Sequence, residues 1–540
     1  MRKLQLKEAL SKLKANKINT KKSKEVALPL PAQRPMPRGF KVVEKYPLCE
    51  PFAQVAIVQN PKTGEHMYIL DELQLDVLER GVYNRILEIL LAEMESPKEE
   101  VRDPRKFFTD EAKKMVSKYR ISLGWLPDVS WYKIIYHAER DLVGFGKIDA
   151  VMKDPNIEDI SCDGVKKPVY VWHRNYESIE SNVRFESDEE LDNMVVKLVH
   201  MAGRHVSSAF PIVDASLPGK HRLAVCYRRE VTSFGTAFTI RKFKEDPYSI
   251  IDLINIGTFS EEMAAYIWLC LEHRASIMVL GGTAAGKTTA LNALTCLIRP
   301  GSKIITIEET AELNLPHENW VSLIARQSYG LSGNNIGEVA LFDLVKTSMR
   351  HRPDVLIVGE VRGQEAYILF QALATGHGGM CTMHAENLDS AIKRLTQKPM
   401  DISPAYIPLM NIIMSVQRVH VIRGNEKKAF RRILDINEIA DYDDYRTILK
   451  WNPAKDIHLH TFDKSVILSK ISERTGTTRK ELIDEIERRR NMLHWMREKN
   501  IRSYKDVAAM IAEYYTKPKQ ASEQVLVGEE VKPIAVSGKT

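Results

Sequence analysis

Cysteine is scarce in this sequence. The 540 residues include six cysteines, which lie far apart and form no C-x-x-C pair. A disulfide scaffold or a structural zinc site needs grouped cysteines, so this spacing argues against both. It fits a protein that works in a reducing compartment. The six positions are Cys49, Cys162, Cys226, Cys270, Cys296 and Cys381.

Long apolar runs are also missing. The charge-free stretches 367–385 and 402–417 are interrupted by glycine and histidine or by proline. A helix that crosses a bilayer needs about 20 consecutive apolar residues, and a secretory signal needs an apolar core behind its first charges. We therefore expect a cytoplasmic protein whose contact with the cytoplasmic membrane, if any, is peripheral.

Net charge is absent from most of the chain. The formal net charge is +7, and residues 1–25 alone hold nine Lys or Arg against two Asp or Glu. Subtracting these from the totals of 78 and 71 leaves 69 residues of each sign in the remainder. A protein that tracks nucleic acid needs a basic surface along its body, so no nucleic-acid partner is expected.

The basic N-terminal arm carries Leu4, Leu6, Leu10 and Leu13 between its lysines. It is either a solvated, mobile tail or an amphipathic helix that forms on an acidic surface. In the second case acidic lipid is one partner of the arm.

The length predicts several domains, since one core cannot serve 540 residues. Composition and periodicity divide the chain into five parts. They are a basic arm and proline-rich linker (1–37), an α+β N-terminal domain (38–241) that could include a separate helical subdomain (38–131), a linker (242–257), an α/β domain with C-terminal helices (258–517) and a disordered tail (518–540).

Alternating strand and helix patterns set the fold class of both main domains. In the first, strands are expected at 157–162, 168–173, 223–227 and 237–240, with a helix that starts at a Ser187/Glu190 capping box. In the second, core strands are expected at 277–280, 303–307, 355–358 and 379–383 with helices between them. This α/β alternation is typical of a doubly wound sheet with ligands at the carboxyl ends of its strands.

The stretch 281–288, Gly-Gly-Thr-Ala-Ala-Gly-Lys-Thr, lies between an apolar strand and a helical pattern. It matches G-x-x-x-x-G-K-[ST], whose backbone N–H groups surround phosphates at a helix N-terminus. We expect ATP and Mg²⁺ here, with Lys287 on the β- and γ-phosphates and Thr288 on the metal. The residues expected to bind the nucleotide are Gly282, Thr283, Ala284, Ala285, Gly286, Lys287, Thr288 and Thr289.

Hydrolysis needs a group that orients water. The apolar strand 355–358 ends on Gly359 and Glu360. If that strand lies beside the P-loop strand, Glu360 projects toward the γ-phosphate as the water-polarising base. The alternative is an ordinary surface glutamate at a strand end.

Two further groups follow predicted strands. Glu308 and Glu312 could hold Mg²⁺ through water or assist the base, and could equally cap the next turn. His377 and His384 flank the glycine-rich strand 379–383, where an imidazole could hydrogen-bond the γ-phosphate. Each histidine could instead be structural, but their place on a third core strand favours the active site.

In their order along the chain, these motifs resemble the type II/IV secretion ATPase superfamily. Within it, residues 140–517 are most similar to the archaeal branch and its archaellum (archaeal flagellum) motor ATPases. Bacterial relatives often carry paired C-x-x-C zinc motifs, which this chain lacks. Further stretches similar to the archaeal branch are Asp159 to Gly164, Pro168 to Val171, Thr239 to Phe243 and Glu487 to Tyr515.

The resemblance implies a homo-hexameric ring of two-lobed subunits, each with a RecA-like C-terminal ATPase domain. It also implies catalytic arginines from the N-terminal domain, for which Arg222 and Arg241 are the matching positions. The ring would act on a polytopic membrane platform protein and other cytoplasmic archaellum motor components, driving filament assembly and rotation. An archaeal type IV pilus ATPase would have the same site, and a nucleic-acid translocase is disfavoured by the balanced charge.

Overall fold

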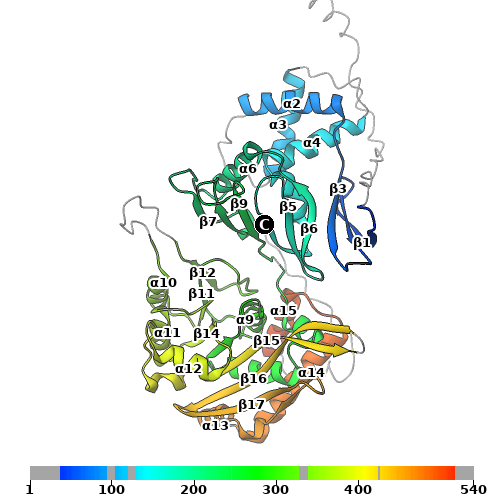
Figure 1. The fold of residues 1–540 in the computed structure, drawn as a ribbon. Coiled ribbons are helices and arrows are strands. Elements are labelled where there is room, and N and C mark those ends of the chain that lie inside the picture. The colour runs from blue at the N-terminus through cyan, green and yellow to red at the C-terminus, as the bar shows by residue number, and fades with distance from the viewer. Residues whose placement is uncertain are drawn as a thin grey trace, which may run out of the picture. The chain divides into compact units, whose positions relative to one another are not determined.

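The computed structural model describes residues 37–93, 104–119, 128–244, 246–326, 338–423 and 426–516. The basic arm up to residue 36 and the expected tail from residue 518 lie outside them. The chain divides into two compact units, unit 1 up to Phe243 and unit 2 from Lys244 (Figure 1). Each unit is built on one nine-stranded sheet.

Unit 1 is an α+β domain whose sheet has the order β1-β2-β3-β6-β5-β4-β9-β8-β7. All neighbouring strands are antiparallel except β3 and β6. Its elements are β1 (Lys41–Cys49), β2 (Ala53–Gln59), β3 (His66–Glu72), α2 (Val77–Glu93), α3 (Pro104–Lys118), α4 (Asp128–Leu142), α5 (Asp149–Lys153), β4 (Ile157–Cys162), β5 (Pro168–His173), β6 (Glu177–Arg184), α6 (Asp188–Met201), β7 (Ile212–Ser216), β8 (Arg222–Cys226) and β9 (Ala237–Arg241).

The N-terminal part of unit 1 differs from the expected helical subdomain. Residues 41–72 form three strands that extend the main sheet through the β3–β6 pairing. The reason lies in the runs Ala53 to Val58 and Tyr68 to Leu70, which are buried and too short for helices. The helices α2, α3 and α4 do lie together (Figure 1), and they pack around a small apolar cluster.

Helix α6 begins where its sequence predicts, with half of the expected capping box, since the Glu190 carboxylate accepts a hydrogen bond from the backbone N–H of Glu186 and not from that of Ser187. Ser187 is the N-cap, and its hydroxyl accepts a hydrogen bond from the backbone N–H of Glu190 at 3.2 Å. The apolar positions Leu191, Val195 and Leu198 are fully buried against the sheet. A capping side chain and a 3.6-residue apolar period therefore suffice to place this helix.

Unit 2 is an α/β domain with the sheet order β12-β11-β13-β14-β10-β15-β16-β17-β18. The strands are parallel from β12 to β15 and antiparallel from β15 to β18. Its elements are α7 (Ile250–Asn255), α8 (Glu261–Glu272), β10 (Ile277–Leu280), α9 (Lys287–Thr295), β11 (Ile304–Glu308), β12 (Trp320–Ile324), α10 (Leu341–Ser348), β13 (Val355–Val358), α11 (Glu365–Ala374), β14 (Gly378–Met383), α12 (Leu388–Thr396), β15 (Ile412–Arg423), β16 (Glu426–Asp441), β17 (Asp444–Asn452), β18 (Ile457–His460), α13 (Val466–Thr475), α14 (Arg479–Glu498) and α15 (Tyr504–Thr516).

Helices cover both faces of this sheet. Strand β10 shows this best, because Ile277 and Val279 belong to one apolar core while Met278 and Leu280 belong to another. The first core lies against α7, α8, α9 and the C-terminal helices, and the second against α10, α11 and α12. A strand buried on both faces carries a continuous apolar run, which is what 277–280 shows.

The predicted linker 242–257 is wrong over its second half, where α7 forms. Ser249 and Asp252 close a capping box at its start. Ile250, Leu253 and Ile254 are buried in the core of unit 2. The cap and the apolar residues behind it outweigh the Asp246-Pro247 pair that suggested a linker.

The apolar segments and the cysteines of the sequence can each be compared with the structure. Among the described residues, no helix combines the length and apolar character that crossing a membrane requires. Four cysteines, Cys162, Cys270, Cys296 and Cys381, are buried. Burial raises the pKa of the Cys162 thiol to about 11 and that of Cys296 to about 12.

Candidate nucleotide-binding site

The parallel strands of unit 2 bring most of the predicted site residues to one edge of the sheet. Strand β14 pairs with β10 on one side and with β13 on the other, and β11 pairs with β13. Because carboxyl ends of parallel strands share an edge, the segments that follow β10, β11, β13 and β14 meet there. These segments carry the P-loop, Glu308, Glu360 and His384.

The pairing corrects one expectation about the sheet. The strand that leads to Glu360 does not lie beside the P-loop strand, since β14 lies between β13 and β10. Sequence order could not show this, because β14 follows both strands in the chain. As a result His384, which directly follows β14, lies between Lys287 and Glu360.

The P-loop has the backbone that its glycines suggest. Gly286 has a φ of 94° at the N-cap of α9, a left-handed conformation that favours glycine. Gly281 is required for a different reason. A Cβ atom there would lie 2.5 Å from the backbone oxygen of Val416 on β15.

Lys287 lies inside the loop with only 8% of its surface exposed. Its Nζ donates a hydrogen bond to the carbonyl oxygen of Gly282 at 2.9 Å, and lies 3.4 Å from each ring nitrogen of His384. Burial lowers the pKa of Lys287, an effect that the nearby Glu360 carboxylate opposes. The ammonium is thus held at the loop in a partly desolvated position.

Glu360 connects the histidine to an arginine that the sequence analysis did not single out. Its Oε1 lies 3.4 Å from His384 Nε2, and its Oε2 accepts a hydrogen bond from Arg362 at 2.7 Å. Arg362 also lies 3.6 Å from the carboxylate of Glu309. The Val-Arg-Gly sequence directly after Glu360 was the signal that could have pointed to Arg362.

The imidazole of His384 is held in a cationic environment. Burial and the nearby Lys287 ammonium lower its pKa, while Glu360 raises it. Arg394 on α12 donates a hydrogen bond to the backbone carbonyl of His384. His384 is therefore neutral near pH 7 and can donate or accept one hydrogen bond at the edge of the loop.

The two predicted acidic residues lie differently. Glu308 is 3% exposed, and its Oε1 accepts hydrogen bonds from the backbone N–H groups of Glu312 and Leu313, both at 2.9 Å. This oxygen therefore caps the turn, one of the two alternatives that the sequence left open. Glu312 is exposed and acts on Lys287 only electrostatically.

His377 is not part of this site in the chain described here. It precedes β14, whereas His384 follows it, so the two histidines lie at opposite edges of the sheet. The seven intervening steps span roughly 23 Å in an extended strand. The Nδ1 of His377 instead lies 2.9 Å from the Thr375 hydroxyl and 3.1 Å from the carbonyl oxygen of Ala372.

Arg222 and Arg241 belong to unit 1. They occupy directly opposed positions on β8 and β9. Arg241 forms an ion pair of 3.1 Å with Asp159, and Arg222 one of 3.7 Å with Asp214. Both arginine side chains are exposed, that of Arg241 by 61% and that of Arg222 by 41%.

The expected Mg²⁺ site has few protein donors. Among the residues that the structure describes, no group of three His, Cys, Asp or Glu side chains could hold a metal ion. Mg²⁺ usually keeps several waters and takes phosphate oxygens with one or two protein ligands, so Thr288 beside the P-loop fits that mode. A protein-only metal cage does not fit the described residues.

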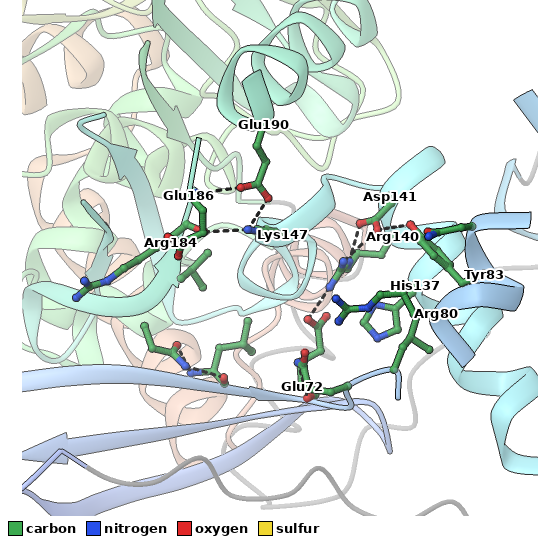
Figure 2. A pocket seen from close by; sticks show the side chains of 16 residues that line it. Glu72, Arg80, Tyr83, His137, Arg140, Asp141, Lys147, Arg184, Glu186 and Glu190 are labelled. Atoms are coloured by element: carbon green, nitrogen blue, oxygen red, sulfur yellow. Dashed lines mark hydrogen bonds and ion pairs between the residues drawn. The ribbon is translucent and has the colours of Figure 1, made fainter. Parts of the chain in front are cut away.

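Unit 1 contains a cavity of about 570 Å³, shown in Figure 2, where its charged side chains pair with one another. Arg140 lies 2.7 Å from Glu72 and 2.8 Å from Asp141. Lys147 forms an ion pair with Glu190. These pairs join the end of β3 to α4, and η1 (Gly146–Ile148) to α6.

The chain matches known proteins over most of its length. The family described as type II/IV secretion system protein matches residues 146–523. Uncharacterized protein MJ0900 of Methanocaldococcus jannaschii is 37% identical over 394 residues, which are 71% of this chain and 70% of that protein. Putative conjugal transfer protein Rv3659c of Mycobacterium tuberculosis is 32% identical over 256 residues, 46% of this chain and 71% of that protein.

Solved structures give partial likenesses. The Legionella pneumophila ATPase DotB is 15% identical and covers 71% of this chain and 95% of its own, with a TM-score of 0.38. The VirB11 ATPase from the Brucella suis type IV secretion system is 21% identical and covers 56% of this chain and 93% of its own, with a TM-score of 0.27. The family match covers far more than half of the sequence and includes the whole P-loop edge. The chain therefore belongs to the type II/IV secretion ATPase superfamily, and it is an ATPase.

Proposed function

We propose that this chain is the motor ATPase of an archaellum, a hexamer that hydrolyses ATP to drive assembly and rotation of the filament through a polytopic membrane platform protein. The observation that carries the catalytic part is the row Lys287, His384 and Glu360 at the carboxyl edge of the sheet. Relatives in Methanocaldococcus jannaschii support the archaeal assignment. The coarser role, an ATP-driven motor of a secretion or pilus-like system, follows from the family itself.

In the proposed reaction, the P-loop N–H groups and Lys287 bind the β- and γ-phosphates of ATP. Glu360 orients the attacking water and accepts its proton. His384, 3.4 Å from both Lys287 and Glu360, responds to the presence of the γ-phosphate. Bound Mg²⁺ supplies charge neutralisation between the phosphates, and Thr288, with Glu308 through water, would hold it.

Arg222 and Arg241 are proposed to reach the γ-phosphate of an ATP in the ring. Their present partners are carboxylates in exposed ion pairs, which contribute little to stability. Exchanging a carboxylate for a phosphate therefore costs little, and it places a cation where charge develops in the transition state. Appearance and loss of the γ-phosphate would then be linked to the position of unit 1.

The proposal also covers the cellular location and the partners of the ring. The hexamer works in the cytoplasm against the membrane platform and other archaellum motor components, and the basic arm contacts acidic lipid. No nucleic acid takes part. Deletion of the gene should abolish swimming, whereas loss of adhesion alone would assign the chain to a type IV pilus system.

The catalytic proposal is tested by steady-state ATPase measurements on the purified hexamer. Lys287→Ala should lose nucleotide binding, and Glu360→Gln should bind ATP but turn it over at least about 100-fold more slowly. Glu473→Gln on α13 makes the same charge change at an exposed site and serves as the control. Normal turnover in both site variants would refute the assignment.

Arg222→Ala should retain ATP affinity while kcat falls, because the arginine acts mainly in the transition state. An unchanged kcat in this variant would exclude the proposed contribution of Arg222.

A further inference from the structure

The hairpin formed by β15 and β16 is in direct contact with the P-loop. The first residues of β15, Ile412 to Ser415, pair with the whole length of β10, and the Val416 carbonyl lies against Gly281. The register between β15 and β16 shifts between Ser415 and Val416, where Leu434 forms an extra residue in β16. Such bulges redirect the side chains beyond them and are frequent next to active sites.

Beyond the bulge, Arg431 lies on the P-loop. Its Nε donates a hydrogen bond to the carbonyl oxygen of Ala284 at 3.3 Å. The stem of Arg431 lies against Gly286, where an added Cβ atom would be 2.9 Å from Arg431 Cδ. Among the described residues, no carboxylate lies within ion-pair distance of this guanidinium.

Arg431 also has a cation beside it. Arg418 on β15 is its direct cross-strand partner, so the two side chains share a face of the hairpin. This face of the hairpin therefore carries two guanidinium groups, and the P-loop that Arg431 contacts is a site for polyphosphate.

We propose that Arg431, with Arg418 beside it, binds the α- and β-phosphates of the nucleotide in the P-loop of its own chain. This rests on the proposed function of that loop. The guanidinium would exchange the Ala284 carbonyl for phosphate oxygens, with which its planar fork forms stronger, charge-assisted hydrogen bonds.

The location of Arg431 explains why these phosphates are assigned. It contacts the loop at Ala284 and Gly286, part of the backbone that surrounds the α- and β-phosphates. Glu360 and His384, by contrast, lie where the γ-phosphate is expected. Arg431 should therefore hold ADP as firmly as ATP, in contrast to the arginines of unit 1, which are proposed to respond to the γ-phosphate.

Calorimetric titration of the full-length hexamer with ADP, and of a Glu360→Gln background with ATP, tests this at two salt concentrations. Arg431→Ala should weaken both nucleotides by a similar factor of about ten or more. The salt dependence of binding should become shallower, because one ionic contact is lost. Arg431→Lys should recover part of the affinity, and Arg418→Ala should show a smaller effect of the same sign. Arg446→Ala, an exposed arginine on β17, is the matched control.

Three results would overturn the inference. The first is an unchanged ADP affinity in Arg431→Ala. The second is a loss of affinity without a change in its salt dependence, which would show that Arg431 only supports the loop. The third is a loss of affinity for ATP but not for ADP. A Lys287→Ala control distinguishes a failure of this inference from a failure of the proposed function. If it abolishes binding while Arg431→Ala does not weaken it, only this inference fails. If Lys287→Ala binds and hydrolyses ATP normally, the proposed function fails.

Discussion

Lys242, the residue after β9, offers a quantitative test of the energetics of unit 1. Its backbone N–H donates to Glu158, and its ammonium donates to the carbonyl oxygen of Asp154. Burial lowers the pKa of Lys242 from 10.5 to about 8, more than Asp154 raises it. The perturbation is Lys242→Met, which keeps the apolar stem and removes the charge.

The sign follows from proton binding. Between about pH 8 and pH 10.5 the unfolded chain holds a proton on Lys242 that the folded chain does not. The free energy of unfolding of the natural protein therefore rises with pH across that window, and below it the cost of the buried charge is fully present. With about 1.4 kcal/mol for each pH unit, the whole change amounts to about 3 kcal/mol.

The assay is urea unfolding of both proteins at pH 7 and pH 10.5, followed through the transition of unit 1. The stability of Lys242→Met relative to the natural protein should be about 3 kcal/mol more favourable at pH 7 than at pH 10.5. The lost hydrogen bond to Asp154 adds only a constant offset. Lys113→Met, an exposed lysine on α3, corrects for general charge effects. A difference that stays constant, or that grows toward alkaline pH, would refute the reasoning.

Three further predictions follow from single contacts. Arg140→Ala should lower the free energy of unfolding by about 3 kcal/mol in a urea titration, since it leaves the nearly buried Glu72 uncompensated, and an unchanged midpoint would contradict this. Gly281→Ala should reduce ATP affinity at least about tenfold because its Cβ would overlap the backbone of β15, whereas Gly81→Ala, with open space, should not. In a pH–rate profile, protonation of His384 should reduce turnover only below pH 6.5, because burial and nearby cations lower its pKa, and His384→Asn should lack that limb. A fall beginning above pH 6.5 would exclude His384 as its cause.

Local patterns predicted the strands and the helix around the candidate site well. The strand 355–358 is β13 residue for residue, and the P-loop context of strand, glycines and helix is confirmed. Both succeed because each segment is buried on two faces and carries a continuous apolar run. The start of α6 at Ser187 could also be predicted, because a capping side chain hydrogen-bonds to backbone groups within four residues of its own position.

What failed depended on contacts distant in sequence. The insertion of β14 between β10 and β13, and hence the separation of His377 from His384, follows from strand order, which no local pattern encodes. The long strand β16 was missed because its first half is dominated by charged residues, which do not resemble a core strand. The position of Arg431 could not be predicted either, because only the pairing of β15 with β16 brings this residue to the P-loop.

The buried thiols described above have a practical consequence. At neutral pH, thiols with a raised pKa remain protonated and react slowly with maleimides and other thiolate-directed reagents. Spin or fluorescent labels could therefore be attached to cysteines introduced on the surface of each unit while these four native positions stay in place. Spectroscopic distances between such labels would follow the two units through a catalytic cycle.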